Sequence, residues 1–304
     1  MVPAAWPLTG VAASDVAGRP ALTVKIENSI DARPQTGLEQ ADMVWEEVVE
    51  GGITRFAAVF QSQVPAEVGP VRSVRPMDPV IAGPTKGLIA FSGGQAGFVA
   101  KVKASPLQAF SQDLGSPGFY RKSGVAPAPH NLYGTPSVWW AHADAAHNAP
   151  PPHQFVFARS ADQATAVTAG TPATKIAVTM SGGEHPNWAW DAASGTWQRS
   201  EGGTPAVSRS GKRLAFANVI TLSVRLVDTG TKDPAGNPVP ETVLAGTGTG
   251  TVSSGGHTIA VTWSKGSDSE PVVLTTSDGK PVALAPGTTW VELVPSGSGG
   301  VQAS

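Results

Sequence analysis

The segment ADMVWEEVVEGGITRFAAVFQ, residues 41–61, decides how the N-terminal part of the chain folds. Gly51 and Gly52 separate two runs that are rich in β-branched and aromatic residues, which is a strong signal for a β-hairpin. The alternative is a helix, because Ala41, Val44, Trp45, Val48 and Val49 also have helical spacing. We favour the hairpin, with Glu50 opposite Ile53 and Val48 opposite Arg55.

The segments on either side of this hairpin predict an α/β layer. Residues 22–27 (LTVKIE) alternate between apolar and polar side chains, as a strand does. Residues 87–91 (GLIAF) predict a buried strand that runs into Ser92, Gly93 and Gly94, and residues 95–102 then have helical character. Strand, glycine loop and helix together form one unit of an α/β fold.

From about residue 174 onward the sequence predicts short strands separated by Gly, Asp and Ser turns. The proline-rich stretch NAPPPHQ, residues 148–154, marks the change of pattern, since three consecutive prolines stiffen a connection. We therefore predict an α+β protein with a mixed α/β domain over residues 1–155 and a smaller β-rich domain over residues 156–296. Residues 297–304 are predicted to be a flexible tail.

Charged residues gather between Lys25 and Asp78, in segments that otherwise read as buried. Fourteen of these 54 residues are charged, about twice the 14% of the whole chain. The acids are Glu27, Asp31, Glu39, Asp42, Glu46, Glu47, Glu50, Glu67 and Asp78, and the bases are Lys25, Arg33, Arg55, Arg72 and Arg75. Such a concentration predicts either a structural ion-pair network or a cleft for a polar ligand.

In the hairpin register above, Glu46 and Glu50 share one face and Arg55 lies diagonal to both. Arg55 is then expected to pair with these two glutamates. The segment EVGPVRSVRP, residues 67–76, places Arg72 and Arg75 three residues apart, where two guanidiniums repel each other unless negative charge is near. If Arg55 takes both glutamates, Arg72 and Arg75 need another partner, which could be a ligand.

Composition excludes several classes of protein. The chain of 304 residues has no cysteine, so disulfides and thiolate chemistry are absent, and its formal charge of −2 argues against nucleic-acid binding. No apolar run is long enough for a membrane span, and residues 1–10 lack the features of a signal peptide. We expect either a cytosolic protein or one whose targeting segment has been removed.

Several of these segments together resemble the YerB-like lipoprotein family. The resemblance is carried by PLTG (residues 7–10), VKIENSIDARPQTGLEQADMVWEEVVEGGITRF (24–56), GPVRSVRP (69–76) and PAPHNLYG (127–134). In the second half, VTWSK (261–265) and LAPGTTWVELVP (284–295) resemble the smaller C-terminal domain of that family. The motifs occur in the family's order and cover nearly the whole chain.

The resemblance implies a location rather than a reaction. Members are typically exported and tethered by a lipid on an N-terminal cysteine, and a chain that starts after that cysteine would lack it and the signal. It implies an extracytoplasmic, lipid-anchored precursor in the cell envelope. The matching motif residues are Glu27, Asn28, Arg33, Glu46, Glu50, Gly51, Gly52, Arg55, Gly69, Arg72, Ser73, Arg75, His130, Asn131 and Tyr133.

Three functions are compatible with these residues. The first is binding of a polar or anionic envelope ligand, such as a cell-wall glycan, by Asn28, Arg33, Arg55, Arg72, Ser73, Arg75, Asn131 and Tyr133. The second is hydrolysis of a glycan or phosphodiester, with Glu27, Glu46, Glu50 and His130 as candidate catalytic groups. The third is a scaffold for envelope proteins, in which every charge is paired within the chain.

Two further motifs carry little weight. Ser92 lies in AFSGG (residues 90–94), close to a nucleophile elbow, with Asp113 and His130 following in the expected order. A glycine turn with an incidental serine is the better interpretation. His142, His147 and His153 lack the spacing of a zinc motif, so we predict no metal site and no cofactor.

Overall fold

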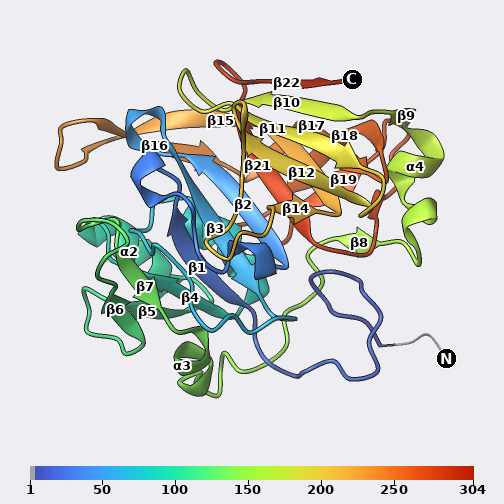
Figure 1. Ribbon diagram of the computed structural model, residues 1–304. Helices are drawn as coiled ribbons and strands as arrows, with labels where there is room; N and C mark the ends of the chain where they lie inside the picture. The colour runs from blue at the N-terminus through green and yellow to red at the C-terminus, as the bar shows by residue number, and fades with distance from the viewer. Residues whose placement is uncertain (1–3) are drawn as a thin grey trace.

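The computed structural model describes residues 4–304, and its centre is a twelve-stranded mixed sheet. The strand order is β19-β18-β17-β15-β21-β2-β3-β1-β4-β5, with β16 added to β15 and β9 to β18 (Figure 1). The strands are β1 (Leu22–Glu27), β2 (Met43–Val48), β3 (Thr54–Phe60), β4 (Leu88–Phe91), β5 (Gln108–Ser111), β9 (Thr171–Pro172), β15 (Asn218–Lys232), β16 (Pro238–Val243), β17 (Gly246–Ser254), β18 (His257–Lys265), β19 (Val273–Thr275) and β21 (Thr289–Pro295).

The predicted hairpin is confirmed, because β2 and β3 pair antiparallel, but its predicted register is wrong by one residue. Val48 lies opposite Thr54, and Glu47 lies opposite Arg55. The turn is longer than two residues: Val49 N donates to Ile53 O at 2.8 Å, and a 3-10 turn spans Glu50–Gly52.

The two halves of the chain contribute to the same sheet. β2 pairs in parallel with β21, from Met43 opposite Thr289 to Glu46 opposite Glu292. In Figure 1 the blue strands of the N-terminal half therefore lie directly beside the orange and red strands of the C-terminal half. The central sheet is therefore built jointly from the segments 1–155 and 156–296.

A second, six-stranded sheet packs on one face of the central sheet. Its strands are β10 (Lys175–Thr179), β11 (Pro186–Asp191), β12 (Thr196–Glu201), β13 (Thr204–Pro205), β14 (Ala215–Phe216) and β22 (Gly300–Ala303). Trp188 and Phe216 of this sheet pack against Trp290 of β21, at 5.4 and 5.1 Å between ring centroids. The prediction of a flexible tail over residues 297–304 is corrected, since β22 pairs with β10 along its length.

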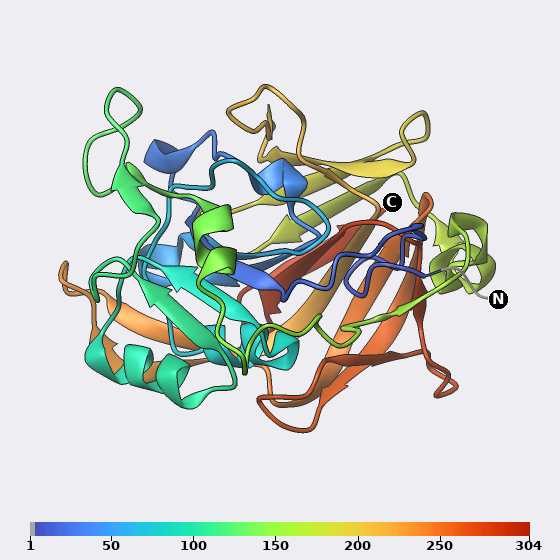
Figure 2. The same cartoon turned by 90° about the horizontal axis from the view of Figure 1, so that it is seen from below.

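Short helices and two-stranded ribbons complete the fold. Figure 2 shows the helices around the edges of the sheets. The helices are α1 (Asp78–Ala82), α2 (Ala96–Ala104), α3 (Pro136–Ala141) and α4 (Thr165–Ala169). The ribbons are β6 (Phe119–Arg121) with β7 (Leu132–Gly134), and β8 (Val156–Phe157) with β20 (Ala283–Leu284). No helix in the described part of the chain is both long and apolar enough to span a membrane.

Alternation along the strands divides the charged segment between the two faces of the central sheet. Side chains of neighbouring strand residues point to opposite faces. Glu46 and Thr54 therefore face the six-stranded sheet, while Glu47 and Arg55 face the other way. The charges that are concentrated in sequence form two separate networks in space.

Candidate functional site

The first network surrounds Arg199 of β12, between the two sheets. Its guanidinium lies over Trp290 at 4.4 Å from the ring centroid, with Trp188 and Phe56 at 5.4 and 5.5 Å. We call these four residues the Arg199 cage. A guanidinium surrounded by aromatic faces gains cation–π attraction, which is stronger where water is excluded.

Three carboxylates neutralise Arg199. Its guanidinium nitrogens lie 2.8 Å from Glu46, 2.8 Å from Glu201 and 2.9 Å from Glu292. Burial opposes the charge, yet the three carboxylates together raise the pKa of Arg199 above its usual value. Burial also raises the pKa of Glu46 well above its usual value, although Arg199 opposes this. Glu46 comes from the N-terminal half of the chain, whereas Arg199, Glu201 and Glu292 come from the C-terminal half. The ion pairs therefore hold the two halves together.

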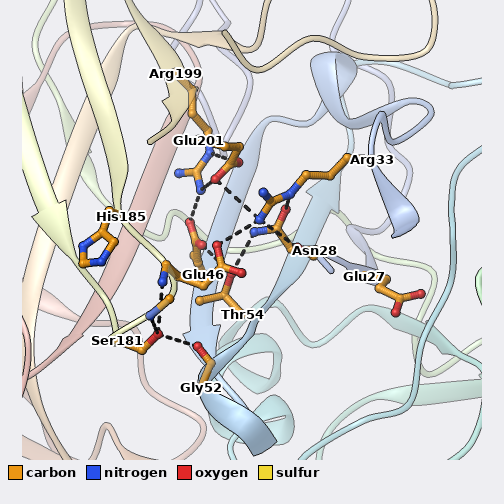
Figure 3. Close-up of polar contacts among 12 residues, drawn as sticks. Glu27, Asn28, Arg33, Glu46, Gly52, Thr54, Ser181, His185, Arg199 and Glu201 are labelled. Carbon is orange, nitrogen blue, oxygen red and sulfur yellow. Dashed lines mark hydrogen bonds and ion pairs between the residues drawn. The ribbon is translucent and has the colours of Figure 1, made fainter. Parts of the chain in front are cut away.

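Hydrogen bonds continue from Glu46, the partner of Arg199, through Thr54 and Asn28 to Arg33, as Figure 3 shows. Thr54 Oγ1 donates to Glu46 at 2.7 Å, and Asn28 Nδ2 donates to Thr54 at 2.8 Å. Arg33 Nε donates to Asn28 Oδ1 at 3.0 Å, and its Nη2 bonds Glu184 at 2.9 Å. Asn28 and Arg33, which we predicted to bind ligand, thus have partners within the chain.

The second network, on the opposite face, contains Lys25 with two acids. Lys25 Nζ contacts Glu47 and lies 2.7 Å from Asp78 Oδ1, and all three side chains are buried. Burial and the neighbouring Asp78 raise the pKa of Glu47 to about 7, although Lys25 opposes the rise. One cation shared by two buried carboxylates leaves this trio short of positive charge.

Stability is expected to fall as the pH rises from about 4.5 to about 7. Folded Glu47 holds its proton to about pH 7 while the unfolded chain releases it near 4.5, so the folded state is favoured on the acid side. The rise in pKa corresponds to about 3 kcal/mol of unfolding free energy. Urea unfolding across this range measures it, and Glu47→Gln should flatten the profile. An equally steep fall in Glu47→Gln would contradict the assignment to Glu47.

Arg55, Arg72 and Arg75 gather beside this trio, and we call them the arginine site. Arg75 forms a two-point ion pair with Glu50, at 2.5 Å for Nε–Oε1 and 2.8 Å for Nη2–Oε2. Arg72 Nε lies 3.3 Å from Glu27 Oε2. Two of the three guanidiniums therefore already have a carboxylate partner.

Arg55 is the exception, although its side chain is only 5% exposed. Its Nη1 donates to the Ser73 carbonyl at 2.8 Å, and within residues 4–304 no carboxylate lies within ion-pair distance. Nε is buried without a partner, and Nη2 makes no hydrogen bond to any described residue. Burial, followed by the charges of Arg75 and Arg72, lowers the pKa of Arg55 to about 10.

The free edge of Arg55 has a defined chemistry. The Nε–H and one Nη2–H of a guanidinium point in parallel, and this pair binds the two oxygens of a carboxylate or phosphoryl group. Ser73 Oγ and Ser92 Oγ lie close by, 3.2 Å from each other. An oxyanion is therefore the kind of group that would satisfy this edge.

His130 borders the site through Glu27. Its Nδ1 lies 2.9 Å from Glu27 Oε1, which also accepts a hydrogen bond from Ser29 Oγ at 2.9 Å. Two other predicted ligand residues, one next to His130 and one in β7, have different neighbours. Asn131 Oδ1 accepts a hydrogen bond from Arg121, and the buried ring of Tyr133 packs against Gly69.

Two predictions about the glutamates are wrong. Glu46 and Glu50 do not share a face, because the chain leaves β2 at Val48 and the turn carries Glu50 to the opposite side from Glu46. Arg55 pairs with neither, so the arginine left over is Arg55 and not the pair Arg72 and Arg75. The one-residue difference in register is the cause of both errors.

The proposed catalytic acids lack the setting that a hydrolase needs. Glu27, Glu46 and Glu50 are 1%, 0% and 5% exposed, and each is paired with an arginine. Ser92 Oγ contacts Ser73, whereas His130 bonds Glu27, so the residues of the elbow-like motif are not joined into a triad.

The sequence interpretation missed several residues that build the two networks. The missed residues of the first network are Glu184, Arg199, Glu201 and Glu292. In the second network the residues were noted, but the pairing of Lys25 with Glu47 and Asp78 was not predicted. One available signal was the pattern of β12, where Trp197 and Arg199 occupy alternate positions and therefore share the inner face.

Fold and interior define a strand-rich protein of two parts that share one sheet and one buried arginine–glutamate network. Residues 8–149 match the family model described as "Protein of unknown function (DUF3048) N-terminal domain", and residues 176–291 match the C-terminal domain of the same family. The chain belongs to this family.

Known relatives agree with this assignment. The chain is 27% identical over 301 residues to "Putative lipoprotein YerB" of Bacillus subtilis (strain 168), covering 95% of this chain and 86% of the relative. A crystal structure of YerB protein from Bacillus subtilis matches with a TM-score of 0.82 at 24% identity, covering 98% of this chain and 99% of that chain. The family resemblance predicted from the motifs is confirmed.

Proposed function

We propose that this chain is an extracytoplasmic protein of the cell envelope that binds an anionic ligand at the arginine site. The location is supported by the name of the Bacillus subtilis relative, "Putative lipoprotein YerB". A lipid tether in the precursor belongs to the same proposal. The ligand is a polar envelope component, such as a cell-wall glycan, that carries an oxyanion.

One observation supports binding above the alternatives: Arg55 is buried and charged, and its two-point edge has no partner within the described chain. An uncompensated buried charge destabilises a protein unless a partner neutralises it. A scaffold with purely structural charges would be expected to pair Arg55 with a carboxylate, as Arg72 and Arg75 are paired. The buried state of Glu27, Glu46 and Glu50 disfavours the hydrolase alternative.

Arg55→Gln is expected to abolish the binding of inorganic phosphate. In the wild type, phosphate at about 100 times its Kd should raise the free energy of unfolding by about 2.7 kcal/mol, and in the variant this rise should vanish. Without phosphate, the variant should be as stable as the wild type or more stable, because a desolvated charge has been removed. Thermal unfolding with and without phosphate, together with titration calorimetry, measures both effects.

Arg225→Gln is the matched control, since it removes an exposed arginine from β15 with the same change in charge. It should bind phosphate as the wild type does. The proposal fails if wild-type protein shows no heat and no stabilisation with phosphate, or if Arg55→Gln binds it unchanged.

A further inference from the structure

An open pocket of about 580 Å³ lies between residues 17–19 and α3. This volume is within the range of small-molecule sites, typically about 300–1,000 Å³. No residue of the arginine site lines it, and Arg19 supplies the only formal charge among its described lining residues. These residues are Ala17, Gly18, Arg19, Val64, Ser137, Trp140 and Asn148.

The guanidinium of Arg19 is held by two tryptophans. Its Cζ lies 5.5 Å from the ring centroid of Trp140 and 6.0 Å from that of Trp6, within the range of cation–π attraction. The backbone at the same place is fixed from two sides. Trp140 Nε1 donates to Pro20 O at 3.0 Å, and Gln61 Nε2 donates to Arg19 O at 3.3 Å. The guanidinium is therefore preorganised, which lowers the entropic cost of binding a ligand.

Arg19 has no acceptor within residues 4–304, where its side chain forms neither a hydrogen bond nor an ion pair. Burial raises the pKa of Asp42, and the charge of Arg19 opposes this rise. The carboxylate of Asp42, however, already accepts hydrogen bonds from Gln61 N at 2.5 Å and Ser62 N at 2.8 Å. Nε of Arg19 is buried, but the side chain as a whole is half-buried and lines the pocket. Its Nη1–Nη2 end can thus receive both oxygens of a carboxylate from the pocket.

The rest of the lining combines apolar surface with neutral polar groups. The half-buried indole of Trp140 and the 44% exposed side chain of Val64 are apolar. The hydroxyl of Ser137 and the amide of Asn148 are exposed, and within the described chain neither side chain has a hydrogen-bond partner. A sugar ring has the matching surfaces, because its C–H face packs on an indole while its hydroxyl groups form hydrogen bonds.

From this combination we propose that the pocket binds a sugar ring that carries a carboxylate, as in a uronic acid. The carboxylate bonds the Nη1–Nη2 end of Arg19, the C–H face of the ring packs on Trp140, and hydroxyl groups bond Ser137 and Asn148. This is a second site, separate from the arginine site, and it does not depend on anion binding at Arg55.

An NMR titration that follows the indole N–H signals tests the proposal, with Trp140→Phe identifying the signal of Trp140. The probes are glucuronate, glucose and benzoate. We expect glucuronate to shift the Trp140 signal with a Kd at least about tenfold lower than that of glucose or benzoate, because only glucuronate offers both the charge and the hydroxyl groups. Arg19→Gln should remove this preference, and Arg225→Gln, the matched control at an exposed arginine, should keep it.

Ser137→Phe is a second variant, which fills the pocket from an exposed position of α3 and should weaken glucuronate binding. Ala141→Phe adds the same bulk to an exposed position of the same helix outside the pocket and should not. Arg55→Gln should bind glucuronate at Trp140 as the wild type does, which separates this site from the arginine site. The inference is overturned if glucuronate leaves the Trp140 signal in place, if Arg19→Gln binds it unchanged, or if benzoate binds as tightly.

Discussion

Replacing Arg199 with Met is expected to lower the free energy of unfolding by about 3–5 kcal/mol or more at pH 8. Methionine keeps much of the length and apolar contact of arginine but removes its charge. Glu46 and Glu292, both fully buried, would then lack the cation that neutralises them. The net free energy of unfolding of a typical protein is only about 5–15 kcal/mol. The variant should therefore be only marginally folded at about 37 °C.

Urea unfolding at pH 8 and pH 5 is the measurement for this variant. Because the pKa of Glu46 is already raised well above its usual value, acid should protonate it and reduce the deficit. Arg199→Met combined with Glu46→Gln should be more stable than Arg199→Met alone. A variant within about 0.5 kcal/mol of the wild type would contradict the structural role of the cage, as that is the range of ordinary surface substitutions. Arg225→Met, at an exposed position, is the control.

Replacing Lys25 with Met is also expected to lower the free energy of unfolding by about 3–5 kcal/mol at pH 8. The substitution removes the cation shared by Glu47 and Asp78 and leaves two buried acids side by side. Their mutual repulsion should raise the pKa of Glu47 further, so lowering the pH below about 5 should restore most of the loss.

A double variant separates charge from packing at this position. Lys25→Met with Glu47→Gln should recover part of the stability at pH 8, since one of the two orphaned acids is gone. Lys175→Met, on the exposed side of β10, should change stability little. If Lys25→Met lowers the free energy of unfolding equally at pH 5 and pH 8, then lost packing, and not lost charge, explains the effect.

Local pattern was sufficient to predict the hairpin of β2 and β3 and the strand-rich character of the C-terminal half. In each case a run of β-branched or aromatic residues is bounded by turn residues, and the signal lies within a few positions. The continuous sheet was not predictable in this way. The pairing of β2 with β21 joins residues near 45 with residues near 290, and nothing local in either strand specifies its neighbour.

The register of the hairpin of β2 and β3 explains why the predicted partners of Arg55, Glu46 and Glu50 were wrong. Gly51 and Gly52 both have positive φ, at +69° and +75°, which suits a two-residue turn as well as the longer turn that forms. A shift of one residue moves every side chain to the other face of a strand. That is why Arg55 was assigned to Glu46 and Glu50 and instead remains without a carboxylate partner.

The partners of the buried charges were beyond the reach of local pattern for a related reason. The charge count between Lys25 and Asp78 correctly indicated that ion pairs occur there. It could not reveal that Glu46 pairs with Arg199, because that partner lies in β12, far away in the sequence.

The claim that Arg55 binds an oxyanion can be tested most directly by a crystal structure of the protein soaked in selenate. Selenate is a tetrahedral oxyanion, and its selenium can be located by anomalous scattering. We predict an anomalous peak beside the arginine site, with two selenate oxygens within hydrogen-bond distance of Arg55 Nε and Nη2. Peaks only at other surfaces, with the Arg55 edge empty or occupied by a side chain of the protein, would contradict the account.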